Sequence, residues 1–146
     1  MERITATGIA VEHFNRGRTF LNEDKYDEAI LEFEKALATD IGLFRDVRHH
    51  TRMHKGIAHT RRGQLYLDKG NYDQAIADFT AVLSYCPNSH EALFGRGCAY
   101  HLKNEFERAI EDYTAVLMLC PENTEIREKL KEAISCNSGE KSFENE

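Results

Sequence analysis

The chain has 146 residues, 41% of them apolar and 30% charged, and a formal net charge of −6 at pH 7. This composition is typical of one folded domain with a modest core, and it excludes a disordered chain. No apolar run approaches the roughly 20 residues of a membrane-spanning helix, the first residues do not form a secretory signal, and the acidity disfavours binding to nucleic acid.

One segment of the chain recurs with a period of 34 residues. GQLYLDKGNYDQAIADFTAVLSYCP, from Gly63 to Pro87, returns as GCAYHLKNEFERAIEDYTAVLMLCP, from Gly97 to Pro121. A fixed period of this size is typical of stacked supersecondary units. We therefore predict a stack of repeats, each made of two antiparallel helices.

The first repeat, at about residues 10–43, is a weaker copy. Gly17 and Ala29 keep the spacing of the later repeats, whereas Ile41 stands where the later copies have proline. The small residues allow the paired helices to approach closely, and aromatic residues fill the space beside them. The first repeat is therefore predicted to be the same hairpin with a different ending.

An insert of about a dozen residues, LFRDVRHHTRMHK, follows at about residues 43–55. Ala29 and Ala75 lie 46 residues apart, which is 12 more than the period. The insert contains no proline, so we predict that it is mostly helical. Two forms are open: an early start of the first helix of the second repeat, or a separate turn before Gly56.

The second and third repeats, at about residues 56–89 and 90–123, precede a predicted capping helix at about 123–135. An apolar stripe on this charged helix would face the last repeat, as a terminal cap requires. The stripe consists of Ile126, Leu130, Ala133 and Ile134. Residues 1–136 are expected to form a single domain, and the unpatterned residues 137–146 are predicted to be disordered.

Landmark residues of the repeats have a characteristic spacing. The second repeat has Gly63-x2-Tyr66, Ala75-x3-Phe79 and Pro87, and the third has Gly97-x2-Tyr100, Ala109-x3-Tyr113 and Pro121. On these residues the chain resembles the tetratricopeptide repeat family. The resemblance implies an all-α fold, a superhelix (α-α solenoid) of three helix-turn-helix repeats plus a C-terminal capping helix. It extends to small three-repeat members with an insert between the first two repeats.

Two further features recur in every copy. The turn between the helices carries a residue type that tolerates a left-handed backbone: Asp24, Gly70 or Asn104. An arginine precedes each repeat glycine, and an acidic residue follows sixteen residues later: Arg16 with Glu32, Arg62 with Asp78, and Arg96 with Asp112. We predict that each such pair is a structural ion pair that locks its hairpin, or locks one hairpin to its neighbour.

No catalytic motif is present: there is no phosphate-binding glycine loop, no nucleophile elbow and no His-Glu-x-x-His. We therefore expect no enzymatic activity and no cofactor. His50 and His54, with His49 adjacent, share one helix face and could hold a metal weakly, but a solvated basic face is preferred and no metal site is predicted. The cysteine spacing does not indicate a disulfide framework, so reduced cysteines and a cytoplasmic location are expected.

Basic residues concentrate between Arg45 and Arg62, where six of them stand against Asp46 alone, a net charge of +5. The patch comprises Arg45, Arg48, Arg52, Lys55 and Arg62, together with Arg61. Such a patch could steer an acidic ligand or peptide. Equally, it could neutralise acidic neighbours in the Asp24–Glu34 region, and both interpretations are open.

The family resemblance implies that the first helices of the repeats line a concave groove that binds peptides or helices of other proteins. The groove residues of this chain would be Phe14, Arg18, Leu21, Thr60, Arg61, Gln64, Leu67, Glu91, Phe94, Cys98 and His101. The favoured function is therefore an adaptor that binds another protein in this groove. The alternative is a structural subunit that associates with itself or a larger assembly through the basic insert and the convex face.

The best-known ligand mode of the family is a carboxylate clamp for acidic chaperone tails, built from two lysines, two asparagines and an arginine. At the aligned positions this chain has Phe14 and Arg18 for Lys and Asn, Arg61 for Asn, and Glu91 and Gly95 for Lys and Arg. A chaperone cochaperone role is therefore not expected.

The replacements favour a different protein ligand, and neither a membrane nor nucleic acid is expected as a partner. Phe14 and Phe94 favour an apolar or amphipathic ligand, with Arg18 and Arg61 contacting an acidic group on it. The alternative is that the phenylalanines belong to the core or are covered by the insert.

Overall fold

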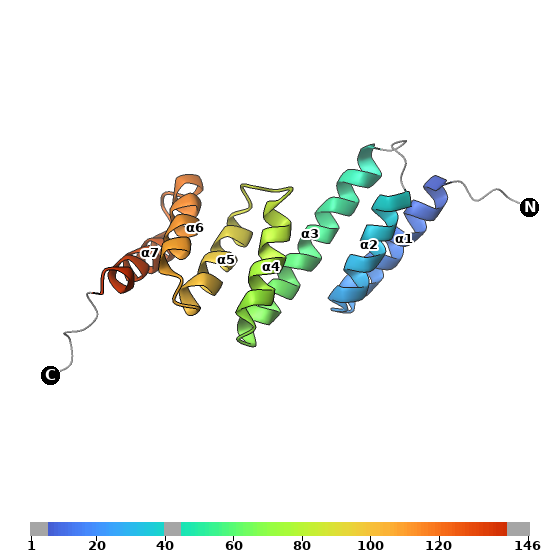
Figure 1. Cartoon of the computed structure of the whole chain (residues 1–146). Coiled ribbons are helices and arrows are strands. Elements are labelled where there is room, and N and C mark those ends of the chain that lie inside the picture. Colours follow the sequence, from blue (N-terminus) through green and yellow to red (C-terminus); the bar gives the residue numbers. More distant parts are fainter. Residues whose placement is uncertain (1–5, 40–44, 140–146) are drawn as a thin grey trace, which may run out of the picture. The chain divides into compact units, whose positions relative to one another are not determined.

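The computed structural model describes residues 6–39 and 45–139. Within these ranges all regular secondary structure is helical, in seven helices (Figure 1). They are α1 (Ala6–Asn22), α2 (Tyr26–Thr39), α3 (Arg45–Asp68), α4 (Tyr72–Leu83), α5 (His90–Leu102), α6 (Phe106–Leu119) and α7 (Thr124–Asn137). The predicted all-α fold class is confirmed.

The chain divides into two compact units, the N-terminal unit Met1–Arg61 and the C-terminal unit Arg62–Glu146. The N-terminal unit contains α1, α2 and the first part of α3. The C-terminal unit contains the rest of α3 and α4 to α7. The single domain over residues 1–136 stays a prediction. Of the predicted tail, Asn137 ends α7 and Ser138 is its C-cap, while residues 140–146 lie outside the described ranges.

The insert is a helical extension. α3 is continuous from Arg45 to Asp68 and has 24 residues, so the first helix of the second repeat begins early and no separate turn precedes Gly56. The first two residues of the predicted insert, at 43 and 44, lie outside the described ranges.

The turns after α1, α3 and α5 have the backbone that their residue types predict. Asp24 has a φ of 57°, Gly70 of 79° and Asn104 of 62°. This is the left-handed region, which glycine adopts freely and Asp and Asn adopt more readily than most residues. The alignment of the three repeats is confirmed at these positions.

Within each repeat, the glycine of the first helix lies against a buried aromatic ring of the second. The pairs are Gly17 with Phe33, Gly63 with Phe79, and Gly97 with Tyr113. A Cβ atom at Gly17 would lie 2.6 Å from a carbon of the Phe33 ring, and one at Gly97 would lie 2.9 Å from the Tyr113 ring. Only glycine allows the helices to pack this closely without moving the ring.

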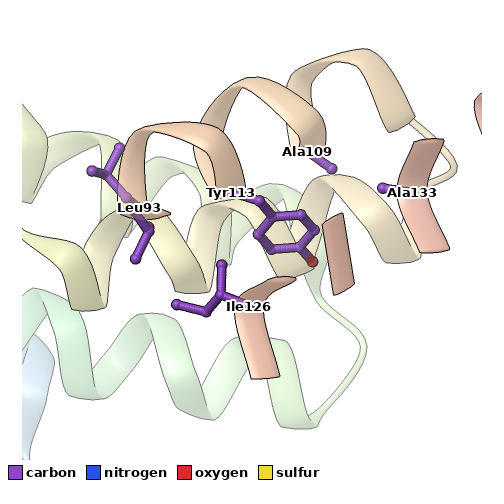
Figure 2. Packing of buried hydrophobic residues seen from close by; sticks show 6 residues of the cluster. Leu93, Ala109, Tyr113, Ile126 and Ala133 are labelled. Carbon is purple, nitrogen blue, oxygen red and sulfur yellow. The ribbon is translucent and has the colours of Figure 1, made fainter. Parts of the chain in front are cut away.

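The capping helix α7 completes the core of the C-terminal unit. Figure 2 shows Ile126 and Ala133 of α7 gathered with Leu93 of α5 around the ring of Tyr113 from α6. The side-chain oxygen of Asn123 accepts a hydrogen bond from the Ile126 amide at 3.1 Å and caps the helix. The predicted stripe is confirmed at Ile126 and Ala133 and partly at Leu130, whereas Ile134 is 48% exposed.

The predicted ion pairs form in the second and third repeats. Arg62 donates two hydrogen bonds to Asp78, at 2.9 and 2.6 Å, and Arg96 donates two to Asp112, at 2.9 and 2.8 Å. Both carboxylates are buried, so these bidentate pairs satisfy charges that water cannot reach. Arg96 also donates to the Thr80 hydroxyl at 3.4 Å, which links α5 to α4 as well as to α6.

The first repeat holds its acidic residue differently, and the prediction of an Arg16–Glu32 pair is wrong. Lys35 donates to Glu32 at 2.7 Å, and His13 Nδ1 lies 2.7 Å from the other carboxylate oxygen. Arg16 instead lies 3.8 Å from Glu12 on its own helix. The hydrogen bonds from Lys35 and then His13 lower the pKa of Glu32, although its burial opposes that shift.

Arg96→Ala should lower the free energy of unfolding by about 1–3 kcal/mol, because it leaves the buried Asp112 carboxylate without its donor. Urea titration followed by circular dichroism measures the change. Arg16→Ala is the matched control, and its exposed pair should contribute less than about 1 kcal/mol. Equal midpoints for the two variants would contradict the structural role of Arg96.

Glu32→Gln should destabilise the N-terminal unit at neutral pH, and its deficit relative to wild type should shrink in acid. A carboxyl whose folded pKa is lowered contributes stability above its unfolded value, near 4.5, and that contribution is lost as the pH falls through the folded value. Urea titrations at pH 7, 4.5 and 3, read from the NMR amide signals of α1 and α2, test this. A deficit independent of pH would exclude this origin.

Candidate functional site

In the N-terminal unit, α1 and α3, the first helices of the first and second repeats, meet at an aromatic contact. The Phe14 ring lies edge-on to the His54 imidazole, with 5.2 Å between centroids. The centroid of the Phe33 ring lies 6.2 Å from that of Phe14 and 6.1 Å from that of His54. Phe14 and His54 are each half-buried. Because His54 belongs to the insert, the expectation that the insert covers Phe14 is the one observed, and Phe14 forms a floor rather than a free anchor.

We call the Phe14–His54 pair the floor. Two exposed arginines, Arg18 and Arg61, lie on the same two helices as the floor. The guanidinium of Arg18 lies 5.8 Å from the centroid of the Phe14 ring, and Arg61 lies on α3. Within residues 6–39 and 45–139, neither guanidinium takes part in an ion pair or hydrogen bond. Both charges are therefore available to an acidic group from outside the chain.

Within the N-terminal unit, three exposed apolar side chains lie on the same helices, and sequence analysis missed them. Met53 and Ile57 are 52% and 40% exposed and precede Arg61 by eight and four residues, so all three share one face of α3. Val11, 36% exposed, precedes Arg18 by seven residues on α1. Extending the groove spacing back from Arg61, by four residues to Ile57 and by four more into the insert to Met53, would have found the two on α3.

The other predicted groove residues on α1 and α3 differ in their exposure. Leu21 is only 5% exposed and packs with α2 in the core, so the prediction that it contacts a ligand is wrong. Thr60 and Leu67 are half-buried. Gln64 is exposed and donates to Asp68 at 2.8 Å.

On α5 most of the predicted positions contact the core. The Tyr113 hydroxyl donates to the Cys98 sulfur at 3.6 Å, and burial raises the pKa of that thiol. The rings of Phe94 and His101 lie 6.1 and 6.2 Å from the Tyr113 ring. Phe94, Cys98 and His101 are each half-buried, and Glu91 is exposed.

Part of the predicted basic patch is neutralised by acidic neighbours. Lys55 donates to Glu34 at 2.8 Å, inside the acidic region named as the alternative, and Arg62 is held in its bidentate pair. The remaining members differ in exposure: Arg45 and Arg52 are exposed and Arg48 is half-buried.

Two of the histidines of α3 donate hydrogen bonds to the backbone of their own helix. His50 Nδ1 donates to the carbonyl oxygen of Asp46 at 2.7 Å, and His54 Nδ1 donates to that of His50 at 2.8 Å. In the part of the chain that the structure describes, no group of three or more His, Cys, Asp or Glu side chains is placed to hold a metal ion.

An aromatic ring occupies the space at Gly95, where the carboxylate clamp has an arginine. A Cβ atom at Gly95 would lie 2.4 Å from the nearest carbon of the Phe79 ring. A Cβ at Gly63 would lie 3.1 Å from the same ring, so α3 and α5 hold the ring from two sides. A larger residue at 95 must therefore displace a buried ring.

Packed helical hairpins that repeat along the chain define the fold as a helical solenoid. Family profiles for the tetratricopeptide repeat match residues 13–40 and 60–124, which together are more than half of the chain. The chain belongs to the tetratricopeptide repeat family.

Solved structures support the same fold. The first repeat domain of Spaghetti (RPAP3), bound to an HSP90 peptide, is 23% identical with a TM-score of 0.60, over 90% of this chain and 95% of that one. The C-terminal domain of a Plasmodium falciparum FK506-binding protein is 20% identical with a TM-score of 0.63, over 92% and 91%. The second domain of human RPAP3, in complex with an HSP70 peptide, is 23% identical with a TM-score of 0.52, over 88% and 97%.

A search of curated proteins finds no match to the chain. Among the residues that the structure describes, no helix has the length and apolar character needed to cross a membrane.

Gly95→Ala should lower the free energy of unfolding by about 1–2 kcal/mol. Alanine gains about 1 kcal/mol of helix propensity, but overpacking typically costs about 1–3 kcal/mol, and a 2.4 Å contact with a ring held on two sides favours the upper end. Urea unfolding measures the change. In a Phe79→Leu background the penalty should shrink, and an unchanged or raised stability in the wild-type background would contradict the packing.

Proposed function

We propose that the chain is an adaptor, without catalytic activity, that binds a peptide or helix of another protein on the surface formed by α1 and the first part of α3 in its N-terminal unit. The observation that carries the proposal is the surface of the N-terminal unit, where Arg18 lies over the Phe14 ring and Arg61 lies about two turns beyond His54 on α3. Both arginines are exposed and, among the described residues, neither forms an ion pair. An acidic group on an apolar ligand would gain charge-assisted hydrogen bonds there.

Acidic chaperone tails are the first ligands to consider, because structures similar to this chain hold HSP90 and HSP70 peptides. We propose that this chain does not bind them through a carboxylate clamp. Two positions support this: Phe14 stands in place of a lysine and packs against His54, and Gly95 stands in place of an arginine where Phe79 leaves no room.

Self-association is the second candidate function. Its support is charge: Arg45 and Arg52 on α3 are exposed, whereas residues 62–146 contain 15 acidic against nine basic residues. A basic surface on one copy could therefore attract the acidic unit of another. Sedimentation at two protein concentrations separates the candidates, since a constant monomer excludes self-association.

The adaptor proposal predicts that Arg18→Glu/Arg61→Glu loses the partners captured by the wild-type chain in an affinity pull-down read by mass spectrometry. Arg45→Glu/Arg52→Glu is the matched control, because it replaces two other exposed arginines, both on α3, and changes the net charge by the same amount. The control should keep the partners. An unchanged list for Arg18→Glu/Arg61→Glu would refute binding at this surface.

The proposal that the chain has no carboxylate clamp predicts no saturable binding of fluorescent SRMEEVD peptide in an anisotropy titration. The first repeat domain of Spaghetti (RPAP3) is the positive control. Saturable binding by this chain that is lost in Arg18→Glu would show that the tail is a ligand after all.

A further inference from the structure

The first part of α3, which begins with the helical extension, contributes to an exposed strip on the surface of the N-terminal unit. The strip comprises Val11 and Arg18 on α1 with Met53, Ile57 and Arg61 on α3. We propose that this strip binds an acidic amphipathic helix of a partner protein, with the extension as a recognition element in its own right. This inference rests on the proposed function and names the ligand class of the same surface.

The contact between Phe14 and His54 places the two helices in register. The ring centroids are 5.2 Å apart, so residue 14 of α1 lies beside residue 54 of α3. Arg18 lies one turn beyond Phe14 on α1, and Ile57 lies about one turn beyond His54 on α3. Lys55 pairs with Glu34 and Arg61 lies near Tyr26, so α3 runs antiparallel to α2 and parallel to α1. The residues of the strip therefore continue in the same direction on both helices.

The opposite face of the extension accounts for its packing. Thr51 and Ala58 are buried, and Ala58 joins the core formed by Phe33 and its neighbours. Met53 and Ile57 lie about 160° and 100° around the helix from these two, respectively, at 100° per residue, and make no part of that core. Their exposure is thus not needed to hold α3 in place.

An amphipathic helix binds by laying its apolar face on an apolar surface. Met53 and Ile57, at i and i+4, present such exposed apolar side chains on one side of α3. Removing two such side chains from a helix-binding surface lowers affinity by about tenfold or more, given the apolar area that each would bury. Methionine is suited to this because its flexible side chain adapts to different partner shapes.

Charge gives the strip a direction. Arg18 and Arg61 lie toward one end, and Asp46, which is exposed and seven residues before Met53, lies toward the other. The interval from Asp46 to Arg61 is about 22 Å at 1.5 Å per residue, the length of a helix of about four turns. The ligand that fits is such a helix, with its acidic residues at the end over the two arginines.

The test uses the full chain and a random library of 16-residue peptides displayed on phage. Enriched peptides should carry apolar residues at i and i+3 or i+4 and acidic residues clustered at one end. A synthetic enriched peptide, labelled for anisotropy, should bind Met53→Ser/Ile57→Ser at least about tenfold more weakly than wild type. Met118→Ser is the matched control, because Met118 is 80% exposed on α6 in the other unit, and its affinity should be unchanged.

The outcomes separate the two proposals. Loss of binding in Arg18→Glu/Arg61→Glu without loss in Met53→Ser/Ile57→Ser would overturn the role of the extension and leave the adaptor surface standing. If the affinity for the peptide is unchanged in both double variants, both proposals are overturned. Enrichment of basic peptides, or no enrichment over the Arg18→Glu/Arg61→Glu variant, would overturn the acidic-helix ligand.

Discussion

Each hairpin of this protein depends on a close contact between a glycine on one helix and an aromatic ring on the next. The ring of Phe79 shows how tight the constraint is, since hypothetical Cβ atoms at Gly63 and Gly95 would both fall inside normal contact distance. A ring held in this way sets the separation of α3, α4 and α5. The polar pairs at the hairpins then form between helices whose spacing the ring has already determined.

The hairpin locks differ in chemistry because their acidic residues differ in surroundings. Asp78 and Asp112 are buried opposite arginines that fit them with two parallel hydrogen bonds. Glu32 has one more methylene group and finds Lys35 one turn along its own helix and His13 across the hairpin. The first hairpin therefore holds its acidic residue with a lysine and a histidine, whereas the others hold theirs with one permanently charged arginine.

The sequence predicted most of the fold, because period, glycines and turn residues are read directly from letters that recur. It predicted the site less well. The spacing of residues does not tell how exposed each side chain is. Leu21 has the spacing of a groove residue but is buried in the core, and Phe14 packs against a histidine from the insert. The partner of Glu32 could not be chosen from spacing alone, since Arg16, His13 and Lys35 all lie within reach along the chain. Met53 was missed because it lies in the insert, outside the repeat to which the spacing was applied, and Ile57 was missed because the groove positions on that helix were taken only from Thr60 onward.

The extension of α3 lies before the repeat glycine rather than after it. An insertion between two packed positions of a helix would turn one of them by 100° per added residue and break its packing. Residues added at the beginning of a helix do not rotate the residues that follow, and each added residue contributes one backbone hydrogen bond. The beginning of α3 is thus a point where length can change during evolution in steps of a single residue while Gly63 keeps its place against Phe79.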